Sequence, residues 1–177
     1  VARGREGQAG PRVVSFSGEY TQKIDAKGRV SIPADFRRVL EQGDPNWTEG
    51  LRARVRIVYG DPRRRFLECY TISAMAEVEA HIRALPRGST RRIILEQFMI
   101  TGSETCEVDG DGRIVLNARL REKLGMSDAV EAVFAGALET FKIWMPQDYA
   151  ADVAERTAQA MAELAEGADI LTLLGEG

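Results

Sequence analysis

A short motif occurs twice in this chain and constrains its fold more than any other feature. The first copy covers residues 24–33 and the second covers residues 108–117. Both copies read apolar-Asp-x-x-Gly-Arg-apolar-x-apolar, and their aspartates are 84 positions apart (109 − 25). A chain that repeats itself is best interpreted first as a structural repeat. We therefore predict two related units, each with a strand, a glycine-containing turn, and a second strand that leads into a helix.

The segments around the motif recur in the same order, and apolar spacing predicts their structure. For the first half we expect strands at 16–24, 29–32, 55–59 and 66–72, with helices at 34–42 and 74–85. For the second half we expect strands at 104–108, 114–116, 130–134 and 138–145, with a short helix after Asn117 and a long one over 146–165. A further helix over 89–100 bridges the halves. The sequence thus predicts an α+β fold.

Several local details follow from residue preferences. Ser73 is expected to cap the helix that begins at residue 74, and Asn117 the short helix of the second half. Residues 135–137, Ala-Gly-Ala, are expected to form the turn of the last hairpin. The inward face of the long helix over 146–165 is expected to carry Tyr149, Val153 and Met161.

Composition and spacing also suggest boundaries. Residues 1–15 are rich in glycine and arginine and have little to bury, which is typical of a disordered extension. The apolar patch at 170–174 is expected to dock, either on its own chain or on a neighbouring one. We predict an extension at 1–15, a first repeat at 16–87, a bridging helix at 88–103, a second repeat at 104–165 and a tail at 166–177.

Charge is distributed unevenly along the chain. Residues 1–92 carry 18 Lys and Arg against 11 Asp and Glu, a net charge of +7, whereas residues 93–177 carry 6 against 16, a net charge of −10. Such asymmetry indicates a basic binding face on an otherwise acidic body. The overall net charge of −3 therefore does not exclude nucleic acid as a partner.

Catalysis finds little support in the sequence. His81 is the single histidine, and we find neither a glycine-rich phosphate loop nor a nucleophile elbow. Cys69 and Cys106 lack the spacing of a metal site and are interpreted as buried thiols. The acidic run 107–112 imitates the start of a calcium loop, but Ala118 stands where the last ligand belongs. We predict no enzyme activity, no cofactor, no metal and no small-molecule substrate.

Hydropathy bears on location. No window approaches the ~20 apolar residues of a membrane span. The first 15 residues lack the apolar core of a signal peptide. The expected location is the cytoplasm, without membrane association.

The first loop has the chemistry of a rigid probe for nucleic acid. Asp25 can accept hydrogen bonds from backbone N–H groups further along the turn, and Gly28 permits a positive φ. Arg29 can pair with Asp25 across the turn, while Lys27 stands at the tip. A loop that is already ordered loses less entropy when it binds phosphates or base edges. The alternative is that the aspartate and arginine only hold the hairpin together.

The second loop keeps this frame with a different tip. Asp109, Gly112 and Arg113 match the first copy, but Asp111 stands where the first loop has Lys27. A carboxylate at the tip repels phosphate. We therefore expect the second loop to act mainly in structure or assembly.

Arginines are also concentrated in the middle of the first half. Arg52, Arg54 and Arg56 alternate along a predicted strand and so share one face, and three arginines follow at 63–65. This stripe either binds nucleic acid or pairs with the acidic second half of the same or an adjacent subunit.

These motifs together resemble the MraZ family of bacterial transcription regulators, within the AbrB-like swapped-hairpin superfamily. The resemblance extends over about residues 16–165. It is carried by Phe-x-Gly-Glu-Tyr at 16–20, the paired Asp-x-x-Gly-Arg loops, Arg91 and Arg92 in the bridging helix, and Phe-Lys-Ile-Trp at 141–144. The chain departs from the family pattern in Asp111, in Asn117 where the first copy has a proline, and in residues 1–15.

The resemblance implies both architecture and function. It implies two tandem AbrB-like (SpoVT-AbrB type) swapped-hairpin repeats that form one pseudo-two-fold β-barrel with flanking helices. Subunits of the family assemble into rings and bind direct repeats in double-stranded DNA, in the promoter of the division and cell-wall gene cluster. The resemblance thus implies a nucleoid-associated repressor of its own operon. The DNA-contacting loops correspond here to Asp25, Lys27, Gly28 and Arg29, and in the second repeat to Asp109 and Arg113.

A second hypothesis is a protein-interaction or assembly module without sequence-specific DNA binding. In that case the acidic second half is the working surface. It predicts no affinity for DNA at moderate salt and a protein partner that can be captured.

Overall fold

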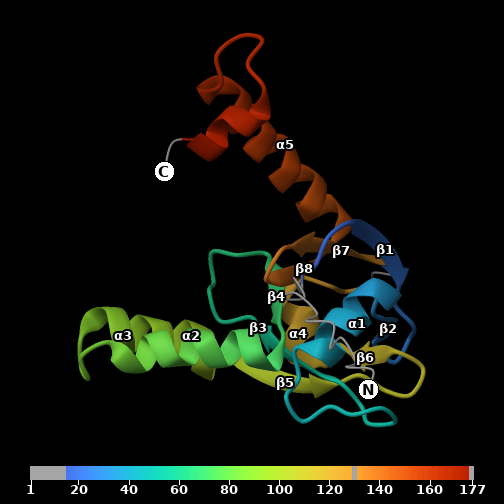
Figure 1. Ribbon diagram of the computed structural model, residues 1–177. Helices are drawn as coiled ribbons and strands as arrows, with labels where there is room; N and C mark the ends of the chain where they lie inside the picture. Colours follow the sequence, from blue (N-terminus) through green and yellow to red (C-terminus); the bar gives the residue numbers. More distant parts are fainter. Residues whose placement is uncertain (1–14, 129–130, 176–177) are drawn as a thin grey trace, which may run out of the picture.

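The structure is a computed structural model that describes residues 15–128 and 131–175 (Figure 1). The extension expected at 1–15 therefore lies, apart from Ser15, outside the described residues, as does Val130 of the expected strand 130–134. Helices and antiparallel strands are mixed in the described part, which confirms the predicted α+β class.

Antiparallel pairing joins six strands into one sheet, with the order β1-β7-β8-β4-β3-β5. The remaining two strands, β2 and β6, pair with each other in a separate ladder. The strands are β1 (Glu19–Lys23), β2 (Arg29–Ser31), β3 (Arg54–Val58), β4 (Phe66–Tyr70), β5 (Ser103–Glu107), β6 (Arg113–Val115), β7 (Glu131–Ala137) and β8 (Thr140–Trp144).

The sheet order reflects the repeat. β1 and β5 begin 84 residues apart (103 − 19), β2 and β6 also 84 (113 − 29), and β4 and β8 begin 74 apart (140 − 66). β1 of the first half pairs with β7 of the second half, and β5 of the second half pairs with β3 of the first. Exchanging the two halves therefore leaves the strand order unchanged. Neither half completes its own sheet.

The closed barrel implied by the resemblance is not formed by the part of the chain that the structure describes. β2 and β6 are only three residues long, and β2 meets the end of β1 through one isolated bridge, between Ile24 and Val30. Strands this short cannot extend the ladders of β1 and β5 around the core. The result is an open sheet with a two-stranded ladder beside it.

In the described part of the chain, five α-helices, one π-helical segment and one 3₁₀ segment surround the strands. Figure 1 shows α2 and α3 side by side on one flank, and α5 leading away from β7 and β8 with η2 at its far end. The segments are α1 (Ala34–Gln42), α2 (Ile72–Ala84), α3 (Thr90–Leu95), the π-helical η1 (Glu96–Thr101), α4 (Ala118–Lys123), α5 (Pro146–Glu163) and the 3₁₀ segment η2 (Ile170–Gly175).

One of the two predicted helix caps is found in the structure. The Asn117 side chain accepts from the backbone N–H of Leu120 as predicted. The prediction for Ser73 was wrong, because Thr71 caps α2 by accepting from the N–H of Ala74. Thr71 is buried at the end of β4, so the strand ends earlier and the helix begins earlier than expected.

Two further predictions were wrong in the second half. Gly136 lies inside β7 and not in a turn, because the chain at Phe16 passes so close that a Cβ at Gly136 would lie 2.6 Å from its carbonyl carbon. Residue Leu138, with φ of 65°, takes the turn instead. In α5, Tyr149 packs against Trp144, but Val153 and Met161 are exposed, since the helix leaves the sheet after its first turns (Figure 1).

The main core is built jointly by both halves. Phe16 and Phe36 of the first half meet Phe141 of the second, with ring centroids 5.0 Å from Phe141 in each case. Phe134 stacks on Phe141 at 5.8 Å. All four rings are fully buried. This shared core fixes the position of β2 and β6, whose Val30 and Ile114 side chains are also buried in it.

The long helices of the described segments were also compared with the requirements for a bilayer. Within residues 15–128 and 131–175 no helix combines the length and apolar character needed to cross a membrane.

Candidate nucleic-acid interface

The first loop is a tight turn locked by its own aspartate. One carboxylate oxygen of Asp25 accepts from the backbone N–H groups of Lys27 and Arg29, both at 2.9 Å, and the other accepts from Arg29 Nε at 2.7 Å. The N–H of Gly28, with φ of 79°, donates to the carbonyl of Asp25. The arginine and the loop backbone are thus held by one carboxylate, and the Lys27 side chain is left at the tip.

The second loop repeats this geometry. Asp109 accepts from the N–H groups of Asp111 and Arg113 at 2.9 Å and from Arg113 Nε at 3.3 Å, and Gly112 has φ of 78°. Arg113 also pairs with the tip carboxylate of Asp111 at 2.9 Å. The tip of the second loop therefore neutralises its own arginine, which the first loop does not do.

The β2–β6 ladder joins the two loops. Arg29 lies opposite Val115, and Ser31 lies opposite Arg113, so the loops stand at opposite ends of the ladder. The carbonyl of Gly28 accepts from the N–H of Leu116, and the equivalent bond links Gly112 to Ile32. Because side chains alternate along a strand, Arg29 and Arg113 share the outer face while the residues between them point into the core. Two arginines fixed on one short exposed ladder are the central feature of this site.

Two further arginines reach the loops from the helices of the opposite halves. Arg37 of α1 lies against Gly112, and Arg121 of α4 lies beside Gly28, again 84 positions apart (121 − 37). Neither arginine was identified from the sequence, although each lies at the same distance after the motif of its own half, and this repetition could have indicated them. Arg121 has a buried Nε without a hydrogen-bond partner within the described part of the chain. It adds a third cation to the first loop.

The arginine stripe has a different role. Arg54 forms a two-pronged pair with the buried Asp44, at 2.7 and 2.8 Å, and its side chain lowers the pKa of that carboxyl. Arg56 donates to the hydroxyls of Ser103 and Thr105, both at 3.1 Å. Among the three arginines of β3 and its approach, and within the described residues, Arg52 alone lies near a carboxylate of the second half, that of Glu107 at 3.9 Å. Arg54 and Arg56 thus fasten β3 to its surroundings through partners that the sequence did not reveal.

Arg63, Arg64 and Arg65 follow β3 at the start of the next turn. Arg63 pairs with Asp61 at 2.8 Å, Arg64 with Glu68 at 2.7 Å, and Arg65 approaches Asp148 at 3.7 Å. These groups lie apart from the β2–β6 ladder.

The prediction of buried thiols is confirmed for Cys69 but not fully for Cys106. Cys69 is fully buried and Cys106 half-buried, and burial raises the pKa of both, to about 12 for Cys106. Among residues 15–128 and 131–175 there is no cluster of three metal-ligating side chains.

The loop glycines allow a test of the ladder. An alanine at either loop position must adopt positive φ, which costs about 1–2 kcal/mol. At Gly28 the new Cβ would also lie 2.6 Å from the Leu116 carbonyl oxygen, whereas at Gly112 it meets the movable Arg37 side chain. We expect Gly28→Ala to lower the free energy of unfolding, measured in urea, by about 1–3 kcal/mol more than Gly112→Ala. Gly50→Ala has positive φ but nothing within 4 Å, and it isolates the backbone contribution. Equal losses in all three variants would contradict the close packing at Gly28.

The loop carboxylates predict a pH dependence. The pKa of Asp25 lies below its ordinary 3.8, mainly because the carboxylate accepts from the N–H of Arg29, and also because it accepts from the Arg29 side chain and from the N–H of Lys27. The N–H of Arg113 lowers the pKa of Asp109 in the same way. Because the pKa of each carboxyl is depressed in the folded state, its contribution to the free energy of unfolding is complete above about pH 4. That contribution is lost as pH falls through the folded pKa. We expect carboxyl NMR titrations of Asp25 to show a midpoint below 3.8 that Arg29→Ala moves part of the way back. A midpoint at or above 3.8 in the unmodified protein would exclude the hydrogen bonds described here.

The sequence is similar to those of known proteins. The MraZ protein family model, described as antitoxin-like, matches residues 15–52 and 99–170. The chain is 50% identical over 167 residues to a protein of Cereibacter sphaeroides, covering 92% of this chain and 96% of that one. A protein of Ruegeria pomeroyi is 49% identical over 159 residues, with 90% and 94% covered. The chain belongs to the MraZ family.

Membership of the MraZ family tests two predictions made from the sequence, the family resemblance and the absence of enzyme activity. A protein of Parvibaculum lavamentivorans is 37% identical over 143 residues, which cover 80% of this chain and 82% of that one. All three of these relatives carry the name transcriptional regulator MraZ. The resemblance stated from the motifs is confirmed. MraZ proteins are a family of transcriptional regulators, which confirms the prediction that the chain is not an enzyme.

Proposed function

We propose that the chain is a sequence-specific DNA-binding transcriptional regulator whose contact surface is the β2–β6 ladder with its two loops. The observation that carries this proposal is Arg29, held by Asp25 at 2.7 Å on an exposed ladder that also presents Arg113. A rigid arginine can donate two parallel hydrogen bonds to a guanine edge or to a phosphate without losing further loop entropy. The name of the curated relatives supports the same role.

Within this surface we propose unequal roles for the loops. The first loop combines three cations, Lys27, Arg29 and the adjacent Arg121, with two carboxylates, that of Asp25 and that of Asp128, which lines the same hollow. The second has Arg113 and Arg37 against two carboxylates, those of Asp109 and Asp111. DNA contact is therefore concentrated on the loop of Asp25, Lys27, Gly28 and Arg29, where the cations Lys27 and Arg29 attract phosphate and Asp25 and Gly28 hold the loop in shape. Asp109 and Arg113 support the ladder and make a weaker contact.

At the finer level we propose two tandem swapped-hairpin repeats, at 16–87 and 104–165, joined by the segment 88–103. The exchange of strands between the halves supports this division. We further propose that copies associate in a ring on the nucleoid and bind direct repeats in the promoter of their own division and cell-wall gene cluster, repressing it. Neighbouring subunits of a ring can present successive ladders to successive boxes, which suits direct repeats better than palindromes.

Selection of bound DNA from a random pool tests this function. We expect enriched molecules to contain a short box repeated in one orientation at a fixed spacing. Affinity for the selected DNA should fall steeply with salt, because each subunit displaces counterions from phosphates. Absence of any enriched box, together with no binding at moderate salt, would favour the assembly-module hypothesis.

A further inference from the structure

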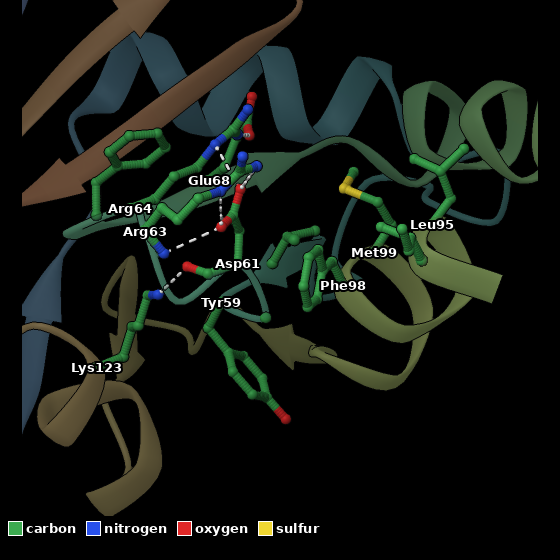
Figure 2. A pocket seen from close by; sticks show the side chains of 13 residues that line it. Tyr59, Asp61, Arg63, Arg64, Glu68, Leu95, Phe98, Met99 and Lys123 are labelled. Atoms are coloured by element: carbon green, nitrogen blue, oxygen red, sulfur yellow. Dashed lines mark hydrogen bonds and ion pairs between the residues drawn. The ribbon is translucent and has the colours of Figure 1, made fainter. Parts of the chain in front are cut away.

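A small apolar cavity lies away from the β2–β6 ladder. It has a volume of about 180 Å³, is partly open to solvent, and lies between the β3–β4 turn and the α3–η1 segment. Figure 2 shows Leu95, Phe98 and Met99 along one side and Asp61, Arg63 and Arg64 opposite them. An apolar cavity of about 150 Å³ can hold a group the size of benzene. This one is therefore large enough for branched apolar side chains.

The rim of the cavity is basic and accessible. Arg63, Arg64 and Lys123 surround the carboxylates of Asp61 and Glu68, and the Arg63 side chain is 81% exposed. Lys123 donates to the backbone carbonyl of Asp61, while the side-chain carboxylate of Asp61 pairs with Arg63 and Arg64. Apolar walls with a net positive rim favour an occupant that is apolar at its centre and acidic at its flank.

The η2 segment has this chemistry. Its apolar side chains are exposed, with Leu171 at 64% and Leu174 at 82%. Asp169 orders the turn by accepting from the N–H groups of Leu171 and Thr172, so the side chains are already presented in a fixed arrangement. Residues 157–175 contain Glu163, Glu166 and Asp169 and no lysine or arginine. Exposed apolar clusters of this kind mark interaction sites.

In the structure η2 and the cavity of its own chain lie at opposite ends of α5. α5 is 18 residues long, which corresponds to about 27 Å, and η2 lies at its far end (Figure 1). Arg65, next to the cavity rim, approaches Asp148 in the first turn of α5, so the cavity lies near the start of that helix. The structure therefore leaves the cavity of each copy open to η2 of a second copy.

We propose that η2 of one copy inserts Leu171 and Leu174 into this cavity of a second copy, with Glu166 and Asp169 facing Arg63 and Arg64. The contact is heterologous, since each copy offers a tail at one place and a cavity at another. Contacts of this type propagate into rings or open chains. The inference rests on the association of copies proposed above and specifies the segments that make it.

The experiment uses paired variants of the full chain. Leu171→Asp combined with Leu174→Asp adds charge to the tail, and Ile94→Asp adds charge to the exposed wall of the cavity. The matched controls are Val153→Asp on α5 and Ile93→Asp, which is exposed on the same helix but does not line the cavity. Light scattering after size exclusion reports the mass of each. We expect the tail and cavity variants to dissociate at least about tenfold more readily than the controls.

Mixing supplies the decisive measurement. The tail variant keeps an intact cavity and the cavity variant keeps an intact tail, so an equimolar mixture should form heterodimers although each variant alone does not associate. A labelled peptide of residues 163–175 should bind the tail variant, and its affinity should fall at least about tenfold when Ile94→Asp is added, but not when Ile93→Asp is added.

The outcomes separate this inference from the proposed function. If the unmodified protein associates and the tail and cavity variants associate equally well, the tail contact is refuted but the ring is not. An unmodified protein that is monomeric would refute the ring, and absence of peptide binding would then refute the tail contact as well. DNA binding through Arg29 is measured independently of both.

Discussion

Replacing Arg29 with alanine is expected to weaken binding to the selected DNA by about 100-fold, while the fold and the association of copies remain intact. A well-placed arginine contact contributes about 1–3 kcal/mol, and its loss is repeated in every subunit on the DNA. The substitution also removes the partner of Asp25, which leaves a carboxylate facing the phosphates. Gel-shift titration at fixed salt measures the change.

Arg38→Ala is the matched control for this substitution. Arg38 lies on α1, is largely exposed and pairs with Asp35 at 3.0 Å, so its removal changes net charge by the same amount without touching either loop. We expect Arg38→Ala to change affinity by less than about threefold. Arg113→Ala should have an intermediate effect of about tenfold, because Asp111 already neutralises part of its charge. Equal losses in all three variants would show that total charge, and not the loop, determines binding.

The second large effect is expected in the core. Phe141→Ala should lower the free energy of unfolding by about 3–5 kcal/mol, the usual range for a deeply buried phenylalanine. Phe141 lies in the second half, yet it packs on Phe16 and Phe36 of the first at 5.0 Å. We therefore expect one cooperative transition for the whole protein, shifted as a unit, in urea unfolding followed by circular dichroism.

Ile93→Ala serves as the comparison for the core variant. Ile93 is apolar but exposed, and truncating it should change stability by no more than about 0.5 kcal/mol. Two separate unfolding steps in the Phe141→Ala protein, with the first half still folded, would contradict a core shared by the two halves.

Much of the fold could be predicted because the local signals were strong. Alternating apolar residues located the strands, and Asn117 caps its helix as its side chain allows. The frame of each loop was also predictable, since an aspartate that accepts from the turn N–H groups needs only residues four positions away or fewer. Interactions this close in sequence depend little on the rest of the molecule.

Other features depended on partners far away in the chain. Gly136 was expected to turn, but the approach of Phe16 from 120 positions earlier (136 − 16) makes it part of a strand. Ser73 was expected to cap α2, but burial of Thr71 under β4 moved the cap. Val153 and Met161 have helical spacing, yet both side chains are exposed in the described part of the chain. Periodicity shows that a helix has an apolar side but not whether anything covers it.

The sequence by itself determined the repeat, the α+β class and the two aspartate-locked loops, because each arises from contacts within a few residues. Only the tertiary structure decided how the halves combine: β1 pairs with β7, β3 pairs with β5, and Arg37 and Arg121 each reach the loop of the opposite half. Pairing between strands far apart depends on which apolar faces can be buried together, and a linear pattern does not contain that information. The same physics leaves the apolar surface of η2 exposed in a single copy of the chain.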